Sequence, residues 1–532
     1  DYFLGGGDAT WIAIGASIFA SNIGSEHLIG LAGAGASSGM AMAHWEIQGW
    51  MILILGWVFV PFYTRSMVYT MPEFLERRYN PQSRTILSVI SLVSYVLTKV
   101  AVTVYAGGLV FQQVFGIKEL WGIDFFWIAA IGLVLLTALY TIFGGMKSVL
   151  YTSVLQTPIL LLGSLIILVL GFKELGGWDE MMRVCGAVTV NDYGDTMTNL
   201  IRSNDDANFP WLGALIGSAI IGFWYWCTDQ FIVQRVLSGK NETEARRGTI
   251  FGAYLKLLPV FLFLIPGMIA FALHQKYIGA GGEGFLPMLA NGNANADAAF
   301  PTLVAKLLPA GVKGLVVCGI LAALMSSLAS LFNSSAMLFT IDFYKRFRPE
   351  TPEKKLVGIG QIATVVIVIL GILWIPIMRS VGDVLYTYLQ DVQSVLAPGI
   401  AAAFLLGICW KRTSAQGGMW GLISGMVIGL TRLGAKVYYS NASEVADSTF
   451  KYLFYDMNWL FFCGWMFLFC IIVVIVVSLT TEAPTTEKIQ GLVFGTATKE
   501  QKAATRASWN YWDIIHTIII LAITGAFYWY FW

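Results

Sequence analysis

Long apolar stretches follow one another along almost the whole chain, with short polar connections between them. They cover residues 10–36, 38–63, 84–115, 123–144, 149–172, 210–235, 248–275, 309–344, 355–379, 381–409, 416–437, 456–480 and 512–532. One helix needs about 20 mostly apolar residues to cross the hydrocarbon core of a bilayer. The pattern therefore predicts about thirteen membrane-spanning helices.

Helices, rather than strands, are the elements that these stretches predict. An outer-membrane barrel would show short segments of alternating apolar and polar residues, and the stretches are instead continuously apolar. Of the 532 residues, 57% are hydrophobic and only 12% are charged, which is too few charges to cover a soluble protein of this size. We predict an all-α polytopic protein whose solvent is the lipid bilayer.

Lysine and arginine residues concentrate in alternate connections, namely 63–84, 235–248 and 344–355. By the positive-inside rule these connections are cytoplasmic. The long connections 173–209 and 276–308 then lie outside the cell, and the predicted spans alternate without contradiction. A formal net charge of +1, without a basic run, gives no reason to expect a nucleic-acid partner.

Two predicted spans are interrupted by polar residues near their middle. The first, 10–36, contains the run from Phe19 to His27, and the sixth, 210–235, contains the run from Gly222 to Gln230. Interrupted hydrophobic segments at corresponding positions of two halves are typical of transporters built from inverted repeats, where they form the binding site. Glycine and serine also occur in spans simply because they allow close helix packing, and that alternative remains open.

The position of these two spans suggests how the chain is divided. Residues 10–172 would form a first repeat of five helices and residues 210–409 a second, with peripheral helices over 416–532. Similarity between the two halves is not visible in the sequence, so this division depends on the positions of the interrupted spans.

Four ionisable residues lie deep within predicted spans: Glu26, Glu46, Asp229 and Lys256. Charged side chains are rare inside a membrane and usually mark a functional site. For Lys256 the alternative is an internal ion pair with Glu26, Glu46 or Asp229 that fixes helix packing. Asp229 lies nearer the cytoplasmic end of its span, and for this residue we favour the structural role.

The side chains near the interruptions suit a polyhydroxylated ligand. A sugar needs hydrogen-bonding groups for its hydroxyls and a flat ring for its apolar face. Candidate rings are Trp45, Trp224, Tyr225 and Trp226, and candidate polar groups are Asn22, Glu26, His27, Glu46, Lys256 and Gln390. A single aromatic residue in a membrane protein usually belongs to the core or the interfacial belt, but three consecutive rings at an interruption are unusual for a belt.

A cation site is also indicated, because a broken helix releases backbone carbonyl groups. Such carbonyls are expected from Ala20 to Ile23, and a facing span offers the hydroxyls of Ser326 and Ser327 with the Ala323 carbonyl one turn earlier. Hydroxyl and carbonyl oxygens are the ligands that hard cations prefer. Serine hydroxyls in helices also bond to their own backbone, which is the alternative for this pair.

Catalytic motifs are not found. The string Gly35-Ala-Ser-Ser-Gly39 matches a nucleophile elbow in letters, but it lacks the strand-turn-helix context. The four histidines do not have metalloprotease spacing. We expect that the chain is not an enzyme, and we see no sign of an obligatory protein partner.

Several motifs together make the chain similar to the sodium/solute symporter family, specifically its sodium-glucose cotransporter branch, over essentially its whole length. They are Ala20-Ser-Asn-Ile-Gly-Ser-Glu-His27, Trp224-Tyr-Trp-Cys-Thr-Asp-Gln230, Tyr254-Leu-Lys-Leu-Leu258, Ser326-Ser-Leu-Ala-Ser330, and Ile400-Ala-Ala-Ala-Phe404 followed by Trp410-Lys-Arg412. The resemblance implies a leucine-transporter-like core of five plus five inverted helices, with three further peripheral helices.

The resemblance also implies roles for matched residues. The residues implied in sugar binding are Asn22, His27, Glu46, Tyr225, Trp226, Lys256 and Gln390, with Tyr225 stacking on the ring as the inner gate. The residues implied in binding one sodium ion between the first and eighth spans are Ala20, Ile23, Ala323, Ser326 and Ser327.

Three positions depart from relatives of this family. His27 stands where a bacterial galactose symporter has Gln, and Gly222 stands where that protein has Asn. Ser153 stands where relatives carry Asp. Because a second cation site would lack that carboxylate, we expect one sodium ion per sugar.

The resemblance therefore implies a multi-pass protein of the cell membrane that takes up a monosaccharide, glucose or galactose, together with sodium by alternating access. Two alternatives remain open. One is a sodium-coupled symporter of another polyol, such as inositol or an amino sugar. The other is a sugar-gated sensor that conducts sodium.

Overall fold

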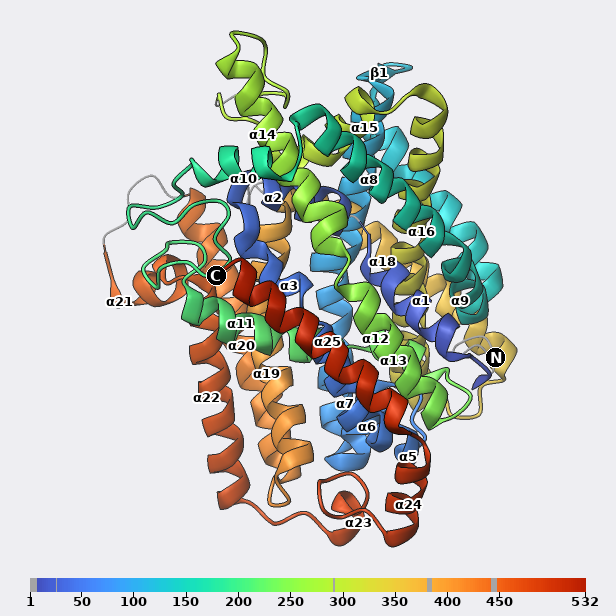
Figure 1. The fold of residues 1–532 in the computed structure, drawn as a ribbon. Coiled ribbons are helices and arrows are strands. Elements are labelled where there is room, and N and C mark those ends of the chain that lie inside the picture. Colours follow the sequence, from blue (N-terminus) through green and yellow to red (C-terminus); the bar gives the residue numbers. More distant parts are fainter. Residues whose placement is uncertain (1–6, 25, 290–291, 380–384, 442–446) are drawn as a thin grey trace.

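The computed structural model describes residues 7–24, 26–289, 292–379, 385–441 and 447–532 (Figure 1). Side chains at a few positions within these ranges, including 142–150 and 152–153, are outside the description. Helices form most of the described chain, and the one paired sheet within it is the short antiparallel hairpin of β1 (Glu119–Leu120) and β2 (Ile123–Asp124). The all-α prediction is confirmed.

The first two apolar stretches are broken helices rather than continuous ones. The first consists of α1 (Trp11–Asn22), the π-helix η2 (Glu26–Leu31) and α2 (Ala32–Ser38). The second consists of the 3₁₀-helix η3 (Gly39–Met42), α3 (Ala43–Glu46), α4 (Gly49–Ile54), the π-helix η4 (Leu55–Phe59) and α5 (Val60–Ser66).

The next part of the chain is more regular. It contains α6 (Met71–Arg78), α7 (Pro81–Ser94), η5 (Tyr95–Val100), α8 (Ala101–Phe115), the hairpin, α9 (Phe125–Leu175) and α10 (Trp178–Gly186). With 51 residues, α9 would be about 77 Å long if it were straight, more than twice the thickness of a bilayer core. Figure 1 places β1 before it and α10 after it at the same end of the molecule, so the chain reverses within α9. This element therefore contains the two predicted spans 123–144 and 149–172.

The second half of the chain again has a broken first span. Its elements are α11 (Trp211–Gly222), η6 (Phe223–Thr228), α12 (Gln230–Leu237), α13 (Glu242–Lys256), η7 (Val260–Leu264), α14 (Ile265–Gly279), η8 (Ala296–Ala298), α15 (Ala299–Leu307), α16 (Ala310–Met337), η9 (Leu338–Tyr344), α17 (Lys345–Phe347), α18 (Glu353–Arg379) and α19 (Leu385–Cys409).

The remaining chain contains the helices expected at the periphery. They are α20 (Ala415–Asn441), α21 (Thr449–Lys451), η10 (Tyr452–Asp456), α22 (Trp459–Thr480), α23 (Thr486–Ile489), α24 (Lys499–Ala507) and α25 (Tyr511–Tyr530). Among the described residues, 10 helical segments are long and apolar enough to cross a membrane, and two shorter apolar helices accompany them. The protein is a multi-pass membrane protein.

The two ends of the helix bundle match the predicted alternation of the connections. Figure 1 shows α6, α23 and α24 at one end and β1, α10 and α15 at the other. The first end carries the arginine-rich connection 63–84, so the positive-inside rule predicts that it is the cytoplasmic end.

Close packing explains several of the glycines that surround the first break. A Cβ at Gly35 would meet the backbone of Leu264, and a Cβ at Gly267 would meet the backbone of Ala32. The small residues therefore allow α2 and α14 to approach backbone to backbone. At Gly35 and Gly267, close helix packing explains the glycine. The polar residues of the run from Phe19 to His27 have other surroundings, which are described next.

Candidate functional site

The first break in the chain lies at the end of α1. Ile23 has extended backbone angles (φ −81°, ψ 96°), its N–H still bonds to the Phe19 carbonyl at 2.8 Å, and helix resumes at Glu26. Because the chain leaves the helix here, the last α1 carbonyls lose their usual acceptor roles within the helix. Asn22 and His27 lie on either side of this break, as predicted.

Two further breaks lie beside the first. Between α3 and α4 the chain turns at Ile47 and Gln48, which the sequence did not predict. The sixth span changes from α-helix to the π-helix η6 and ends at Asp229, whose side chain caps α12 through the Phe231 N–H. The interruption expected in the sixth span is thus present.

A polar pocket lies where these breaks meet. Its lining residues are Asn22, Glu26, His27, Trp45, Glu46, Gln48, Ile221, Gly222, Tyr225, Trp226, Lys256, Gln390 and Gln393. All seven residues implied in sugar binding are therefore brought together here from distant parts of the chain. The cavity measures about 30 Å³, room for about one water molecule, so a ring-shaped solute requires the surrounding helices to move apart.

A continuous chain of polar contacts crosses the pocket. Lys256 Nζ donates to Glu46 Oε2 at 2.6 Å, and His27 Nε2 lies 3.1 Å from the same oxygen. Asn22 lies 3.3 Å from His27 through its side-chain nitrogen, and the Tyr225 hydroxyl donates to Asn22 Oδ1 at 3.1 Å. The Lys256 ion pair with Glu46 is one of the pairings expected from the sequence, and it lies in the pocket wall.

Aromatic rings form the other wall of the pocket. The Lys256 ammonium lies 5.3 Å from the centre of the Trp226 ring, a cation–π distance. Trp226 meets Tyr225 edge to face at 4.9 Å between ring centres. Trp45 also lines the pocket and stacks on Trp459. Trp224 is buried but does not line the pocket, so it belongs to the core.

Directly beside Tyr225 lies an ion pair that the sequence reasoning missed. Lys99 Nζ donates to Asp229 Oδ2 at 2.6 Å and lies 4.6 Å from the Tyr225 ring centre. The Tyr95 hydroxyl donates to the other Asp229 oxygen at 2.5 Å. Lys99 lies in the middle of the apolar stretch 84–115, and that was a signal for a buried charge. Asp229 has the structural role favoured from its position in the span.

One of the proposed cation ligands, Ser327, also reaches the first break. Ser327 Oγ on α16 donates to the Ser21 carbonyl at 3.0 Å, so this hydroxyl bonds across to α1 and not within its own helix. Ser21 Oγ lies 2.9 Å from Ser330 Oγ. A Cβ at Gly24 would collide with the Ser327 side chain, so glycine allows the two helices to come this close.

The chemistry of this contact suits a hard monovalent cation. The residues implied in cation binding are all buried and offer only carbonyl and hydroxyl oxygens: Ala20, Ile23, Ala323, Ser326 and Ser327. Groups of three or more His, Cys, Asp or Glu that could hold a metal ion are not found among the described residues. Oxygen ligands without thiolate or imidazole favour an alkali or alkaline-earth ion over zinc or copper.

Some predicted residues remain less defined. Gln390 lines the pocket from α19, and its Oε1 is buried without a hydrogen-bond partner in the described chain. Ser153 lies on α9, where its side chain is outside the described residues. Glu26 is the first residue of η2, and it also lines the pocket.

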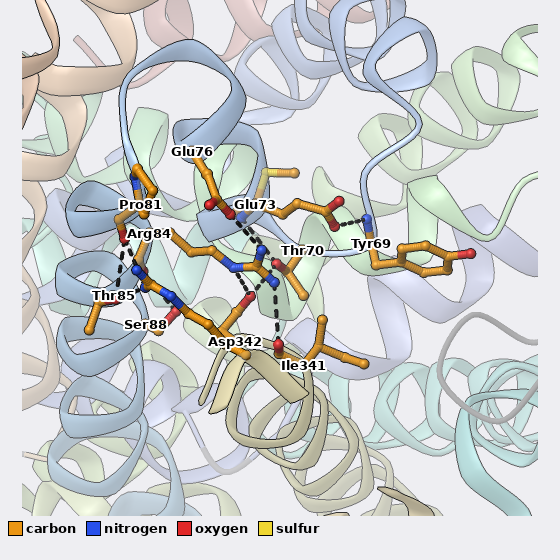
Figure 2. A network of polar contacts seen from close by, with 12 residues as sticks. Tyr69, Thr70, Glu73, Glu76, Pro81, Arg84, Thr85, Ser88, Ile341 and Asp342 are labelled. Carbon is orange, nitrogen blue, oxygen red and sulfur yellow. Dashed lines mark hydrogen bonds and ion pairs between the residues drawn. The ribbon is translucent and has the colours of Figure 1, made fainter. Parts of the chain in front are cut away.

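A second polar network closes the cytoplasmic end of the bundle, and Figure 2 shows it from close by. Arg84 Nε donates to Asp342 Oδ1 at 2.7 Å, and Arg84 Nη1 donates to Glu76 Oε2 at 2.6 Å. The Thr70 hydroxyl donates to the same Asp342 oxygen at 3.0 Å. Asp342 belongs to η9, which continues α16, so this network ties the helix of Ser327 to the connection before α7.

Broken helices that bring polar groups to mid-membrane define a secondary transporter. The sequence comparison gives its class: the model of the sodium:solute symporter family matches residues 2–425. The chain belongs to this family, and it is a sodium-coupled solute symporter. Family membership also agrees with the expectation that the protein is a transporter and not an enzyme.

Curated relatives cover most of the chain. The human sodium/myo-inositol cotransporter 2 is 37% identical over 508 residues, which are 93% of this chain and 74% of that protein. The human sodium/myo-inositol cotransporter is 37% identical over 516 residues, 93% of this chain and 71% of that protein. The mouse sodium/myo-inositol cotransporter 2 is 38% identical over 508 residues, 93% of this chain and 74% of that protein.

Solved structures support the fold. A Na⁺-coupled sialic acid symporter, in a substrate-bound outward-open state, has a TM-score of 0.70 at 22% identity and covers 91% of this chain and 93% of its own. MhsT in complex with L-phenylalanine has a TM-score of 0.50 at 12% identity, over 89% of this chain and 99% of its own. The leucine-transporter-like fold implied by the motifs is confirmed.

Proposed function

We propose that this protein couples the inward movement of sodium to the uptake of a small cyclic polyol, with myo-inositol as the first substrate to test. The observation that carries this proposal is the polar chain from Lys256 through Glu46, His27 and Asn22 to Tyr225. It combines donors and acceptors beside aromatic rings, the mixture that binds a ring with several hydroxyl groups.

The similarity to sodium/myo-inositol cotransporters moves the proposal away from glucose and galactose, which we expected from the motifs. Both kinds of substrate are six-membered rings with several hydroxyls. They differ in the ring oxygen and the hydroxymethyl group, and these features cannot be distinguished by residue types in a sequence. Inositol was one of the alternatives left open, and the relatives support it better than the hexoses.

The proposed substrate ligands are the polar groups of the pocket: Asn22, His27, Glu46, Lys256 and Gln390, with Trp226 as a wall. Tyr225 would stack on the ring and act as the inner gate. The unpaired Gln390 Oε1 supports this assignment, because buried polar atoms normally have a partner and a substrate hydroxyl would supply one.

The proposed sodium ligands are the carbonyl oxygens of Ala20, Ile23 and Ala323 and the hydroxyls of Ser326 and Ser327. The bond from Ser327 to the Ser21 carbonyl supports this assignment, because it brings the α16 serines against the unwound end of α1. A bound sodium ion would take up the Ser327 hydroxyl oxygen in place of that bond.

Coupling would arise because one break serves both ligands. Sodium would use the carbonyl side of the break in the first span, and the polyol would use Asn22 and His27. Each ligand would then raise the affinity for the other by the same factor at equilibrium. We further propose that residues 10–172 and 210–409 form the two inverted repeats that move against each other.

The decisive experiment is reconstitution into liposomes with labelled myo-inositol, glucose and galactose, each with and without an inward sodium gradient. We expect accumulation of myo-inositol only with the gradient, and an inward current because each sodium carries about 2.3 kcal/mol per 100 mV. Uptake that ignores sodium would contradict the proposal. A sodium current without accumulation would favour the sensor, and preference for a hexose would restore the first expectation.

The reversal potential of the same current gives the stoichiometry. We expect one sodium ion per substrate, because Ser153 lacks the carboxylate that relatives carry for a second cation. Two ions per substrate would show that another group has taken over that role.

A further inference from the structure

Gln48 and Gly222 occupy the same side of the pocket, and each determines what the other can be. A Cβ at Gly222 would collide with the side-chain amide of Gln48 and approach its Oε1, Cδ and Nε2 atoms. Both residues line the pocket. The Gln48 amide therefore fills the space that a side chain at position 222 would need.

The Gln48 amide is held in one orientation. Its Nε2 donates to the Ser218 carbonyl at 2.8 Å, one helical turn before Gly222 on α11. Only 3% of Gln48 is exposed, and the residue lies at the turn between α3 and α4, so its backbone is fixed by two helix ends. With the amide nitrogen engaged, the oxygen is the end of the side chain that remains for other partners.

Gln48 Oε1 does not have a hydrogen-bond partner among the described residues, yet it is not sealed within the protein. The Gln48 side chain makes its hydrogen bond through Nε2. Its Oε1 does not belong to the fully buried polar atoms without a partner, so this oxygen is open to the pocket. An acceptor that is oriented, unpaired and part of the pocket wall is suited to receive a hydrogen bond from a bound molecule.

We propose that Gln48 is a substrate-binding and specificity-determining residue, whose Oε1 accepts a hydrogen bond from one hydroxyl of the polyol on the Gly222 side of the pocket. This inference rests on the proposed function. The accepting oxygen belongs to Gln48 in the second span. The Gln48 amide fits there because Gly222 in the sixth span has no side chain.

An acceptor that cannot donate makes a sharp demand on the substrate. The hydroxyl at this position must donate its proton to Gln48. Replacing that hydroxyl with hydrogen removes the bond, and replacing it with fluorine places two acceptors against each other. Both changes therefore weaken binding, whereas a donor in the protein would tolerate fluorine.

The test uses myo-inositols in which single hydroxyls are replaced by hydrogen or fluorine, as competitors of labelled uptake into liposomes. For the natural protein we expect one ring position at which both replacements weaken competition by about tenfold, the effect of one lost hydrogen bond. In Gln48→Ala the natural substrate should compete about tenfold less well, and the two analogues should compete as well as the natural substrate does in that variant.

Two further variants separate this role from a structural one. Gln48→Met keeps the length of the side chain and lacks an acceptor, so it should lose the penalty for the two analogues as Gln48→Ala does, an effect on one ring position that a loss of stability alone would not produce. Gln393→Ala removes another amide of the same pocket wall and should leave the penalty for the two analogues in place. If Gln48→Met keeps that penalty, the inference is wrong.

The close contact also predicts compensation between the two positions. Gly222→Asn alone should abolish uptake, because its side chain collides with Gln48. The double variant Gln48→Ala, Gly222→Asn should recover part of the uptake. Failure of the natural protein to accumulate any polyol would overturn the proposed function, whereas normal accumulation with unchanged analogue penalties in the Gln48 variants would overturn only this inference.

Discussion

Lys256 Nζ lies 2.6 Å from Glu46 Oε2, and both side chains are almost fully buried. This ion pair joins the second and seventh spans within the pocket wall. A buried pair of this kind has two possible roles: it can hold the helices in position, or it can present its charges to a substrate. The contacts of the pair with His27 and Trp226 favour the second role, and the roles can be separated by experiment.

Removing one partner of the pair should be strongly destabilising. We expect Lys256→Met to lower the free energy of unfolding by roughly 3–5 kcal/mol, because it leaves the Glu46 carboxylate buried without a counter-charge. The measurement is the unfolding temperature of the purified protein in detergent.

The double variant Glu46→Gln, Lys256→Met decides between the roles. It removes both charges and should recover most of the lost stability, since neither charge then lacks a partner. We expect that uptake nevertheless stays at least tenfold below that of the natural protein. A stable double variant with normal uptake would show that the pair serves packing alone.

Ser327 should affect the sodium dependence of transport. In Ser327→Ala the hydroxyl that faces the α1 break is lost, and we expect the sodium concentration for half-maximal uptake to rise about tenfold, the effect of losing one of a few oxygen ligands. The matched control is Ser335→Ala on the same helix, because Ser335 is also fully buried but does not belong to the cation ligands. Equal sodium dependence in the two variants would refute the assigned cation site.

The ion pair between Lys99 and Asp229 should keep Tyr225 in place. We expect Lys99→Met to lower stability by roughly 3–5 kcal/mol and to increase the leak of substrate, because the Tyr225 ring loses its cationic neighbour at 4.6 Å. Lys99→Arg retains the charge and should leak less. The measurement is efflux from preloaded liposomes. Equal efflux in both variants would show that the charge of Lys99 does not hold Tyr225 in its gating position.

The cytoplasmic network around Arg84 should favour the state in which that end of the bundle is closed. In Arg84→Gln the contacts to Asp342 and Glu76 are lost, so we expect a larger inward-open population, seen as longer distances between spin labels on α6 and α17. Arg77→Gln is the control, because Arg77 is 46% exposed and pairs only across the surface with Glu73 at 3.3 Å. Its loss should change stability by less than about 0.5 kcal/mol.

Breaks in the spans could be predicted from the sequence where polar residues interrupt an apolar run. The breaks at Asn22 and after Gly222 were visible, because glycine, serine and charged residues interrupt apolar runs there. The break at Ile47 was not visible, because Trp45 to Trp50 contains one charge and otherwise reads as an ordinary span. What holds that turn in place is the contact of Gln48 with α11, and a contact between residues so distant in sequence has no local signal.

Lys99 shows a different limit of the sequence. Its charge within an apolar stretch was visible, but its partner was not, because three carboxylates, Glu26, Glu46 and Asp229, were available deep in other spans and their distances depend on the fold. The substrate is a further case. The polar residues of the pocket indicate a ring with hydroxyls, whereas the choice between inositol and a hexose depends on positions of single atoms such as Gln48 Oε1.

The chain of contacts from Lys256 to Tyr225 has a consequence for how tightly any solute is held. The Lys256–Glu46 and Tyr225–Asn22 contacts already pair a donor with an acceptor, so a hydroxyl that binds to these groups replaces an internal hydrogen bond, whereas Gln390 Oε1 offers a new one. Net affinity is then modest while the demand on hydroxyl geometry stays strict, because a poorly placed hydroxyl breaks an internal bond without replacing it. When the solute leaves, the protein closes on its own polar groups, and Lys256 and Glu46 keep each other as charged partners.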